Sequence, residues 1–231
     1  MAQILPADLF TAEAMALAAL QNALNNQSSG RWSVTLKFEG LRLMPVAIRM
    51  TQALAEKNLE PLMVWPDAGA TALAKRDAPD LAADIRSIRD LLKADNLKDR
   101  NRLLLAAGPQ MSDYEDFAEL CENHGGSVVM LNGRLEDAAV GIGSVARTRR
   151  RGFIASWQQA YWLEPIVGGA LMRAYPEEWM LFRADEDGYR YVTGFEQRPD
   201  AEAIDVGFGL DPASIPQQLG SVERFIDGLS N

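Results

Sequence analysis

The sequence predicts an α/β fold: a single three-layer domain with a mainly parallel sheet and a C-terminal antiparallel hairpin. Short apolar runs of strand length, such as RLLLAAG at 102–108 and SVVMLNG at 127–133, alternate with segments of helical periodicity. This alternation is typical of βαβ units, in which strands buried on both faces pair in parallel. Further along, two alternating runs flank Asp187-Gly188, which is the turn signal of a β-hairpin.

The first elements come from the N-terminal quarter of the chain. Residues 8–26 are rich in alanine with leucines at helical spacing, so they predict a helix within the segment 1–30. WSVTLKF at 32–38 alternates as a strand does. The following segment, 41–58, reads as a helix, because Pro45 falls in its first turn, where a proline is tolerated.

The middle of the chain repeats the alternation of strand and helix. An apolar run near 61–65 predicts a strand, and the second half of 67–97 predicts an amphipathic helix. A helix is expected over 112–126, with Ser112 as its N-cap and a capping box completed by Glu115. The apolar runs on either side of this helix supply two further strands.

The C-terminal third changes character. The hairpin at 178–196 is expected to extend or flank the sheet in antiparallel fashion, and 198–231 is expected to be mostly irregular, with VERFIDGL as a short final helix. No linker or repeat divides the chain, so residues 1–231 are assigned to one domain. The strands expected in its parallel sheet lie near 32–38, 61–65, 102–107 and 127–131.

Charge and composition limit the classes of function. The chain has 23 basic and 32 acidic side chains and a net charge of -9. A general nucleic-acid binder needs a basic face to contact phosphates, so no nucleic-acid partner is expected. An acidic balance of this size fits a soluble protein whose copies repel one another.

Cysteine and histidine are nearly absent, which restricts the chemistry further. Cys121 is the sole cysteine and His124 the sole histidine, so no intrachain disulfide and no multi-histidine metal site can form. We expect no metal and no cofactor, with Cys121 facing the core and His124 near the end of a helix. No apolar run reaches the roughly 20 residues of a membrane span, and no signal or transit peptide is recognised at the N-terminus. These features predict a cytoplasmic location.

A glycine motif at Gly141-x-Gly143-x-x-Ala146 has the spacing of a dinucleotide fingerprint. That fingerprint requires a strand, a tight glycine turn and then a full helix whose amides meet the pyrophosphate. Here nine residues separate the preceding strand from Gly141, and Gly152 interrupts the following segment. The motif is therefore a weak indication of a nucleotide site.

Four arginines follow this motif: Arg147, Arg149, Arg150 and Arg151. Most charge runs of this kind are solvated surface. The next segment, however, spaces Phe153, Trp157 and Tyr161 four residues apart, on one face of an expected helix, with Trp162 beside them. Basic residues beside aromatic ones suit an anionic membrane surface or a partner with an acidic rim. Docking by this segment and an ordinary core role for the aromatic residues are about equally favoured.

A second candidate site follows from the rule that open α/β sheets bind ligands at the carboxyl ends of their strands. The residues at those ends are Asp67, Gly69, Gly108 and Asn132, to which Gly141 and Gly143 can be added. Asp67 is explained more simply as the N-cap of the helix that follows. No catalytic residue is assigned.

Several phrases, in order, carry a resemblance to a known family: WPDAGATALAKRD, LLLAAGPQ, VVMLNGRLEDAAVGIG, ARTRRRGFIASWQQAYWLEP and ALMRAYPEEWMLF. Over roughly residues 5–197 the chain resembles an uncharacterised domain family of oxygenic phototrophs. That family includes the plastid Low Photosystem II Accumulation assembly factors and a domain fused to a plastid adenylate kinase. One small departure is Gly133, where the family pattern has a proline.

The resemblance implies a role in the biogenesis of thylakoid pigment–protein complexes, chiefly photosystem II, and brings no catalytic residues with it. It suggests a cyanobacterial-type member that works in the cytoplasm or peripherally at the thylakoid membrane. We therefore expect a non-enzymatic accessory factor that docks on a photosynthetic complex subunit, on assembly machinery or on an anionic membrane surface. The alternative is a small-molecule or nucleotide-binding enzyme that uses the carboxyl ends of the parallel strands.

Overall fold

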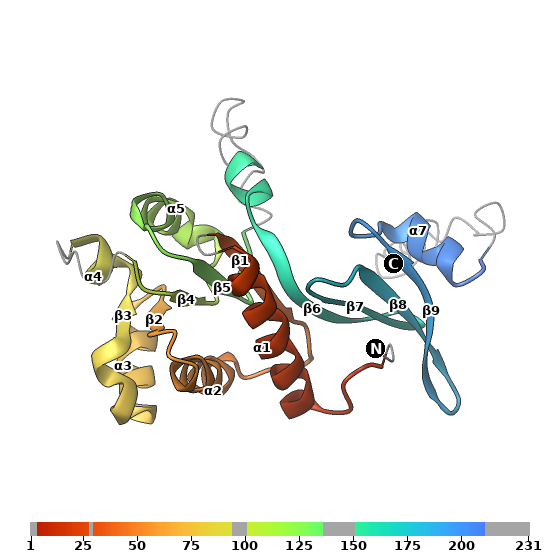
Figure 1. Ribbon diagram of the computed structural model, residues 1–231, viewed down its shortest axis with the longest axis horizontal. Coiled ribbons are helices and arrows are strands. Elements are labelled where there is room, and N and C mark those ends of the chain that lie inside the picture. Colours follow the sequence, from red (N-terminus) through yellow and green to blue (C-terminus); the bar gives the residue numbers. More distant parts are fainter. Residues whose placement is uncertain (1–3, 28–29, 94–100, 136–150, 211–231) are drawn as a thin grey trace, which may run out of the picture.

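One mixed β-sheet runs through the computed structural model, which describes residues 4–27, 30–93, 101–135 and 151–210 (Figure 1). Within these residues the sheet has nine strands in the order β3-β2-β4-β5-β1-β6-β7-β8-β9. The strands are β1 (Arg31–Leu36), β2 (Leu62–Trp65), β3 (Ile85–Ser87), β4 (Leu104–Ala107), β5 (Val128–Leu131), β6 (Gln158–Ile166), β7 (Gly169–Ala174), β8 (Trp179–Asp185) and β9 (Gly188–Phe195). The described helices are α1 (Leu9–Asn26), α2 (Leu43–Glu56), α3 (Ala68–Asp77), α4 (Ile88–Lys93), α5 (Tyr114–Asn123) and α7 (Ala201–Gly207), with short 3₁₀ helices at Pro79–Asp84 and Met111–Asp113.

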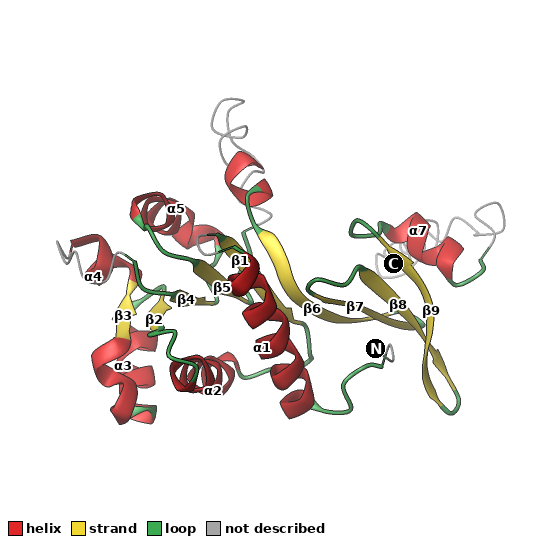
Figure 2. Cartoon of the chain, viewed as in Figure 1, coloured by secondary structure: helices red, strands yellow, loops and turns green. Residues whose placement is uncertain are grey.

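The sheet has a parallel half and an antiparallel half, as Figure 2 shows. Strands β3, β2, β4, β5, β1 and β6 pair in parallel, and β6, β7, β8 and β9 pair in antiparallel fashion. This confirms the predicted α/β class. The four strands expected in one sheet are all there, and the expected hairpin extends the sheet as β8 and β9.

Alternation along the strands separates two apolar layers in the parallel half. On β1, Trp32 and Val34 belong to the core shared with α1, α2 and α3, whereas on β4, Leu104 and Ala106 pack on the opposite face with α4 and α5. Successive strand residues point to opposite faces, so a run buried on both sides needs helices on both sides. The helices are distributed in that way, which gives the three layers seen in Figure 1.

Helix α1 shows how the sequence dictates its own packing. Asp8 accepts a hydrogen bond from the amide of Thr11 at 2.7 Å and caps the helix. The face turned to the sheet is mainly alanine, and Ala12, Ala16 and Ala23 are fully buried. Small side chains let this helix lie close against the sheet, chiefly over β6.

Two predicted helices are wrong in part. Within the segment expected to be an amphipathic helix, residues 85–87 form the edge strand β3, and the α-helix described after it covers 88–93. Ser112, the expected N-cap, does not hold that position either. Instead the side chains of Gln110 and Asp113 cap the 3₁₀ turn reciprocally, and α5 begins after it.

Two further expectations need correction near the C-terminus. The helix predicted to carry Phe153 and Tyr161 on one face ends at residue 155, and the chain continues as strand β6. Residues 201–207, expected to be irregular, form α7, whose N-terminus is capped by Asp200. The predicted short helix at VERFIDGL lies outside the described residues.

Candidate functional site

The carboxyl ends of the parallel strands meet at one edge of the sheet, where the sequence predicts an alternative ligand site. Asn132 follows β5 with a left-handed backbone, φ 50°. Its side-chain oxygen accepts a hydrogen bond from the amide of Leu36 at 2.7 Å, and its side-chain nitrogen donates to the carbonyl of Leu36 at 2.8 Å. The backbone amide of Asn132 also donates to the carbonyl of Val34. The amide group of Asn132 therefore extends the ladder between β5 and β1.

Asp67 and Gly108 also have structural roles at this edge. Asp67 accepts a hydrogen bond from the amide of Ala70 at 2.8 Å, so it is the N-cap of α3, as predicted. Gly108 has φ +64°, and a Cβ atom there would lie 2.7 Å from a methyl group of Leu43 on α2. The left-handed backbone at this position is the conformation that favours glycine.

Three positions of the predicted site remain, of which the structure describes one. Gly69 lies in the first turn of α3, where a Cβ atom would meet the capping carboxylate of Asp67 at 3.0 Å. Gly141 and Gly143 lie outside the described residues. The structure thus brings Asp67, Gly108 and Asn132 to the same edge, as predicted, and gives each of them a role in the fold.

The Arg-aromatic segment is only partly visible. Arg147, Arg149 and Arg150 lie outside the described residues, and Arg151, the first described residue after them, is exposed. Trp157 is half-buried, and its ring stacks on Phe117 with the centroids 5.6 Å apart. This end of the segment packs on the layer that contains α5.

Of the two roles that the sequence left open for the aromatic residues, Tyr161 and Trp162 take the core role. As neighbours on strand β6 they point to opposite faces, and both are buried, Tyr161 completely. Burial raises the pKa of the Tyr161 hydroxyl well above its usual range. The expected helix left a docking role open for them, whereas the strand buries both side chains.

The antiparallel half carries a feature that the sequence reasoning missed. Across β6, β7, β8 and β9 the register aligns Trp162, Arg173, Trp179 and Phe195 as direct cross-strand neighbours. Direct neighbours point to the same face, so these four residues form one line, which we call the tryptophan row. The rings of Trp162 and Trp179 meet edge to face with centroids 5.7 Å apart.

Cationic side chains lie over the tryptophan row. The guanidinium of Arg198 is 4.1 Å from the ring centroid of Trp162, and the Nζ atom of Lys37 is 4.6 Å from it. Both cations pair with the carboxylate of Glu164, at 3.4 Å and 2.9 Å respectively. Glu164 also accepts a hydrogen bond from the indole nitrogen of Trp162 at 3.0 Å.

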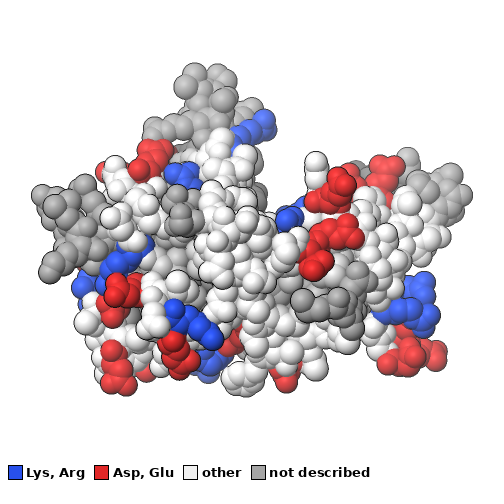
Figure 3. Space-filling view, viewed as in Figure 1, with Lys and Arg blue, Asp and Glu red and all other residues white. Residues whose placement is uncertain are grey.

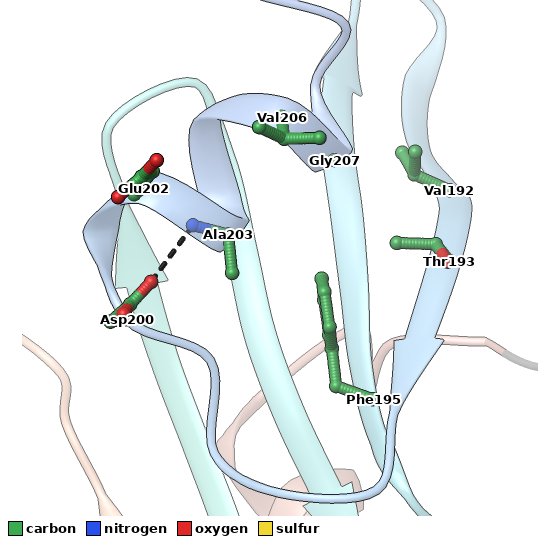
Figure 4. Close-up of a pocket in the computed structure, with 8 residues that line it drawn as sticks. All are labelled: Val192, Thr193, Phe195, Asp200, Glu202, Ala203, Val206 and Gly207. Atoms are coloured by element: carbon green, nitrogen blue, oxygen red, sulfur yellow. Dashed lines mark hydrogen bonds between the residues drawn. The ribbon is translucent and has the colours of Figure 1, made fainter. Parts of the chain in front are cut away.

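An open groove of about 630 Å³ adjoins the row, between strand β9 and helix α7 (Figure 4). Phe195 belongs to both features, because it ends the tryptophan row and also lies beneath α7. We call this hollow the β9–α7 groove, and its lining residues are Val192, Thr193, Phe195, Asp200, Glu202, Ala203, Val206 and Gly207. Figure 3 shows acidic side chains beside α7.

A turn signal in the sequence predicts the first half of the tryptophan row. Ile166 and Gly169 flank a two-residue connection, Val167-Gly168, between β6 and β7. Such a short hairpin fixes the register, and counting outward from it pairs Trp162 with Arg173. The second half of the row depends on the longer connection to β8, which has no comparable signal.

Fold and site together define an α/β protein with two distinct surfaces. Its own side chains occupy the strand-end edge, and in the antiparallel half the tryptophan row, with cations over it, lies beside the β9–α7 groove. No described helix has both the length and the apolarity needed to cross a bilayer. The chain belongs to the family described as a domain of unknown function (DUF1995), whose model matches residues 6–206. No curated protein matches the chain.

Proposed function

We propose that this protein is a non-enzymatic accessory factor in the assembly or stability of a photosynthetic, photosystem-type membrane complex. It acts in the cytoplasm or at the cytoplasmic face of the thylakoid. It docks on a client protein through the docking face, by which we mean the tryptophan row, Lys37, Arg198 and the β9–α7 groove. The photosynthetic setting rests on the sequence resemblance, and the mode of action rests on the geometry of this face.

The observation that carries the proposal is the contrast between the two halves of the sheet. At the strand-end edge, both polar groups of the Asn132 amide are engaged with Leu36, and Asp67 caps a helix. In the antiparallel half, the groove is open and Val206 at its margin is 53% exposed. Concave apolar surface with a polar rim is typical of protein–protein contact sites.

The test is complementation in a phototrophic host that lacks the gene. A Val206→Glu variant places a charge at the groove, and because Val206 is exposed the substitution leaves the core intact. The matched control is Leu73→Glu, which makes the same kind of change at an exposed apolar position. Leu73 lies on α3, which packs on the parallel half of the sheet. The readout is the photosystem content of the membranes at equal level of each variant.

Deletion should lower the photosystem content, and the native protein and Leu73→Glu should restore it. Val206→Glu should not restore it, although the variant accumulates and melts as the native protein does. Full restoration by Val206→Glu would exclude the groove as the docking site. Unchanged photosystem content after deletion would exclude the function itself.

A further inference from the structure

Arg173 is a half-buried cation without an anionic partner among the described residues. Its neighbours across the strands are Trp162 and Trp179, and its guanidinium lies 5.7 Å from the ring centroid of Trp179. The Nε atom is buried and has no hydrogen-bond partner. Buried polar groups are nearly always paired, so an unpaired one needs an explanation.

Desolvation acts directly on this arginine. Burial lowers the pKa of the Arg173 guanidinium, which means that the folded protein destabilises its charge. A methionine or leucine could fill the same space on the sheet without that cost. An unpaired cation held in this way gains free energy when a ligand supplies an anion.

The charges around Arg173 also favour the binding of an anion. Lys37 and Arg198 share the carboxylate of Glu164, so these three described side chains together with Arg173 carry more positive than negative charge. The side chains of Lys37 and Arg198 are each 47% exposed, so a partner can reach them from solvent. This local excess of positive charge lies on a chain whose net charge is -9.

The β9–α7 groove makes the two ends of the docking face chemically different. Phe195 joins the row to the groove, and the groove is lined by apolar Ala203 and Val206 beside acidic Asp200 and Glu202 (Figure 4). One end of the docking face therefore attracts anions, and the other offers apolar contacts bordered by carboxylates. A flat anionic lipid surface would be repelled by that acidic border, whereas a peptide can match both ends.

We propose that the docking face binds an acidic, amphipathic peptide segment, with carboxylates on Arg173 and Arg198 and a neighbouring apolar side chain in the β9–α7 groove. This inference rests on the proposed function as a client-docking protein, and it specifies the chemistry of the client. Carboxylates suit the site because an arginine fork accepts both oxygens of one carboxylate in a charge-assisted pair. The row and the groove then act as charge and apolar anchors of one extended ligand.

The experiment is a selection from a phage-displayed library of random dodecapeptides on the purified full-length chain, followed by fluorescence anisotropy with the recovered peptides. Recovered sequences should combine a run of Asp or Glu with an adjacent large apolar residue. Their affinity should fall as salt rises, because exposed charges are screened. Recovery of basic sequences, or of no sequences above background, would overturn the proposal.

Variants separate a binding role of Arg173 from a structural one. Arg173→Met keeps the volume and removes the charge, so it should weaken peptide binding by about tenfold or more while the melting temperature stays the same or rises. Arg198→Gln should weaken binding as well. The control, Arg190→Gln, removes an exposed cation from β9 about five residues along the strand from Phe195, roughly 16 Å away, and should bind as the native protein does.

Each outcome has a distinct meaning. A lower melting temperature for Arg173→Met with unchanged peptide affinity would assign the arginine to the fold and overturn the inference. If Arg173→Met restores photosystem content in the deletion strain and gene loss lowers it, the function stands and the peptide chemistry fails. If peptides bind as expected but gene loss has no effect on photosystem content, the docking face stands and the photosynthetic role fails.

Discussion

Replacing Asn132 tests whether the strand-end edge is held together by this side chain. In Asn132→Ala, both hydrogen bonds to the backbone of Leu36 are lost, and Leu36 is only 1% exposed, so its amide and carbonyl have no easy access to water. Two such bonds together contribute about 2 kcal/mol. Alanine at φ 50° adds about 1 kcal/mol, because its Cβ atom disfavours the left-handed backbone. The expected loss of unfolding free energy is therefore about 3 kcal/mol.

Urea denaturation followed by tryptophan fluorescence measures this loss. Asn132→Gly separates the two contributions, because it removes the hydrogen bonds and tolerates the backbone, so it should lose about 1 kcal/mol less than Asn132→Ala. A loss below about 0.5 kcal/mol in Asn132→Ala would show that the amide does not hold β5 to β1. The side chain would then be free to serve a ligand.

Three further predictions concern other parts of the chain. Burial raises the pKa of the Cys121 thiol from 9.0 to about 12, so the unfolded chain loses the thiol proton at lower pH than the folded protein. The contribution of this thiol to the unfolding free energy should therefore be fully present below pH 9 and decline towards pH 12, by up to about tenfold in the folding constant per pH unit. Cys121→Val should lack this decline when both proteins are unfolded in urea across that range. Sedimentation with anionic liposomes should weaken with salt and with charge reversal of Arg147, Arg149, Arg150 and Arg151, and equal sedimentation of native and reversed proteins would end that idea. Nucleotides, sugar phosphates and tetrapyrroles should leave the melting temperature unchanged, whereas a ligand at 100-fold excess over its dissociation constant would add about 2.7 kcal/mol and favour the small-molecule alternative.

The strands that the sequence predicts well are those buried on both faces. Every residue of β4, from Leu104 to Ala107, is buried, and β5 is almost as uniform. Composition alone therefore identifies these two strands. The edge strand β3 could not be recognised in this way. Its three residues include the half-exposed Arg86 between buried Ile85 and Ser87, and so short a run resembles one turn of an amphipathic helix.

The error at β6 has a different origin. Phe153, Trp157 and Tyr161 are spaced by four, which is close to the helical period but is also a multiple of the strand period of two. That spacing alone cannot decide between a helix and a strand. The structure uses both, because residues 151–155 are helical and a strand begins at Gln158.

The candidate site was harder to predict than the fold because it depends on register. Asp67 could be assigned from its position before a helix, and the structure confirms the cap. The short hairpin at Val167-Gly168 pairs Arg173 with Trp162, but no local signal pairs Arg173 with Trp179 on β8. Sequence patterns report which residues face inward, whereas the pairing of side chains across three strands requires the connections to be known.

The central position of β1 has a consequence for the order in which the protein can fold during its synthesis. β1 is the first strand made, yet it is flanked on one side by β5 and on the other by β6, and α1 packs chiefly over β6. Until the ribosome has produced residues beyond 160, the nascent chain carries an unpaired backbone edge on β1 and an uncovered alanine face on α1. Open edges of this kind recruit other chains. Early chain termination should therefore give an aggregating fragment, and completion of β6 is the event that closes the parallel half.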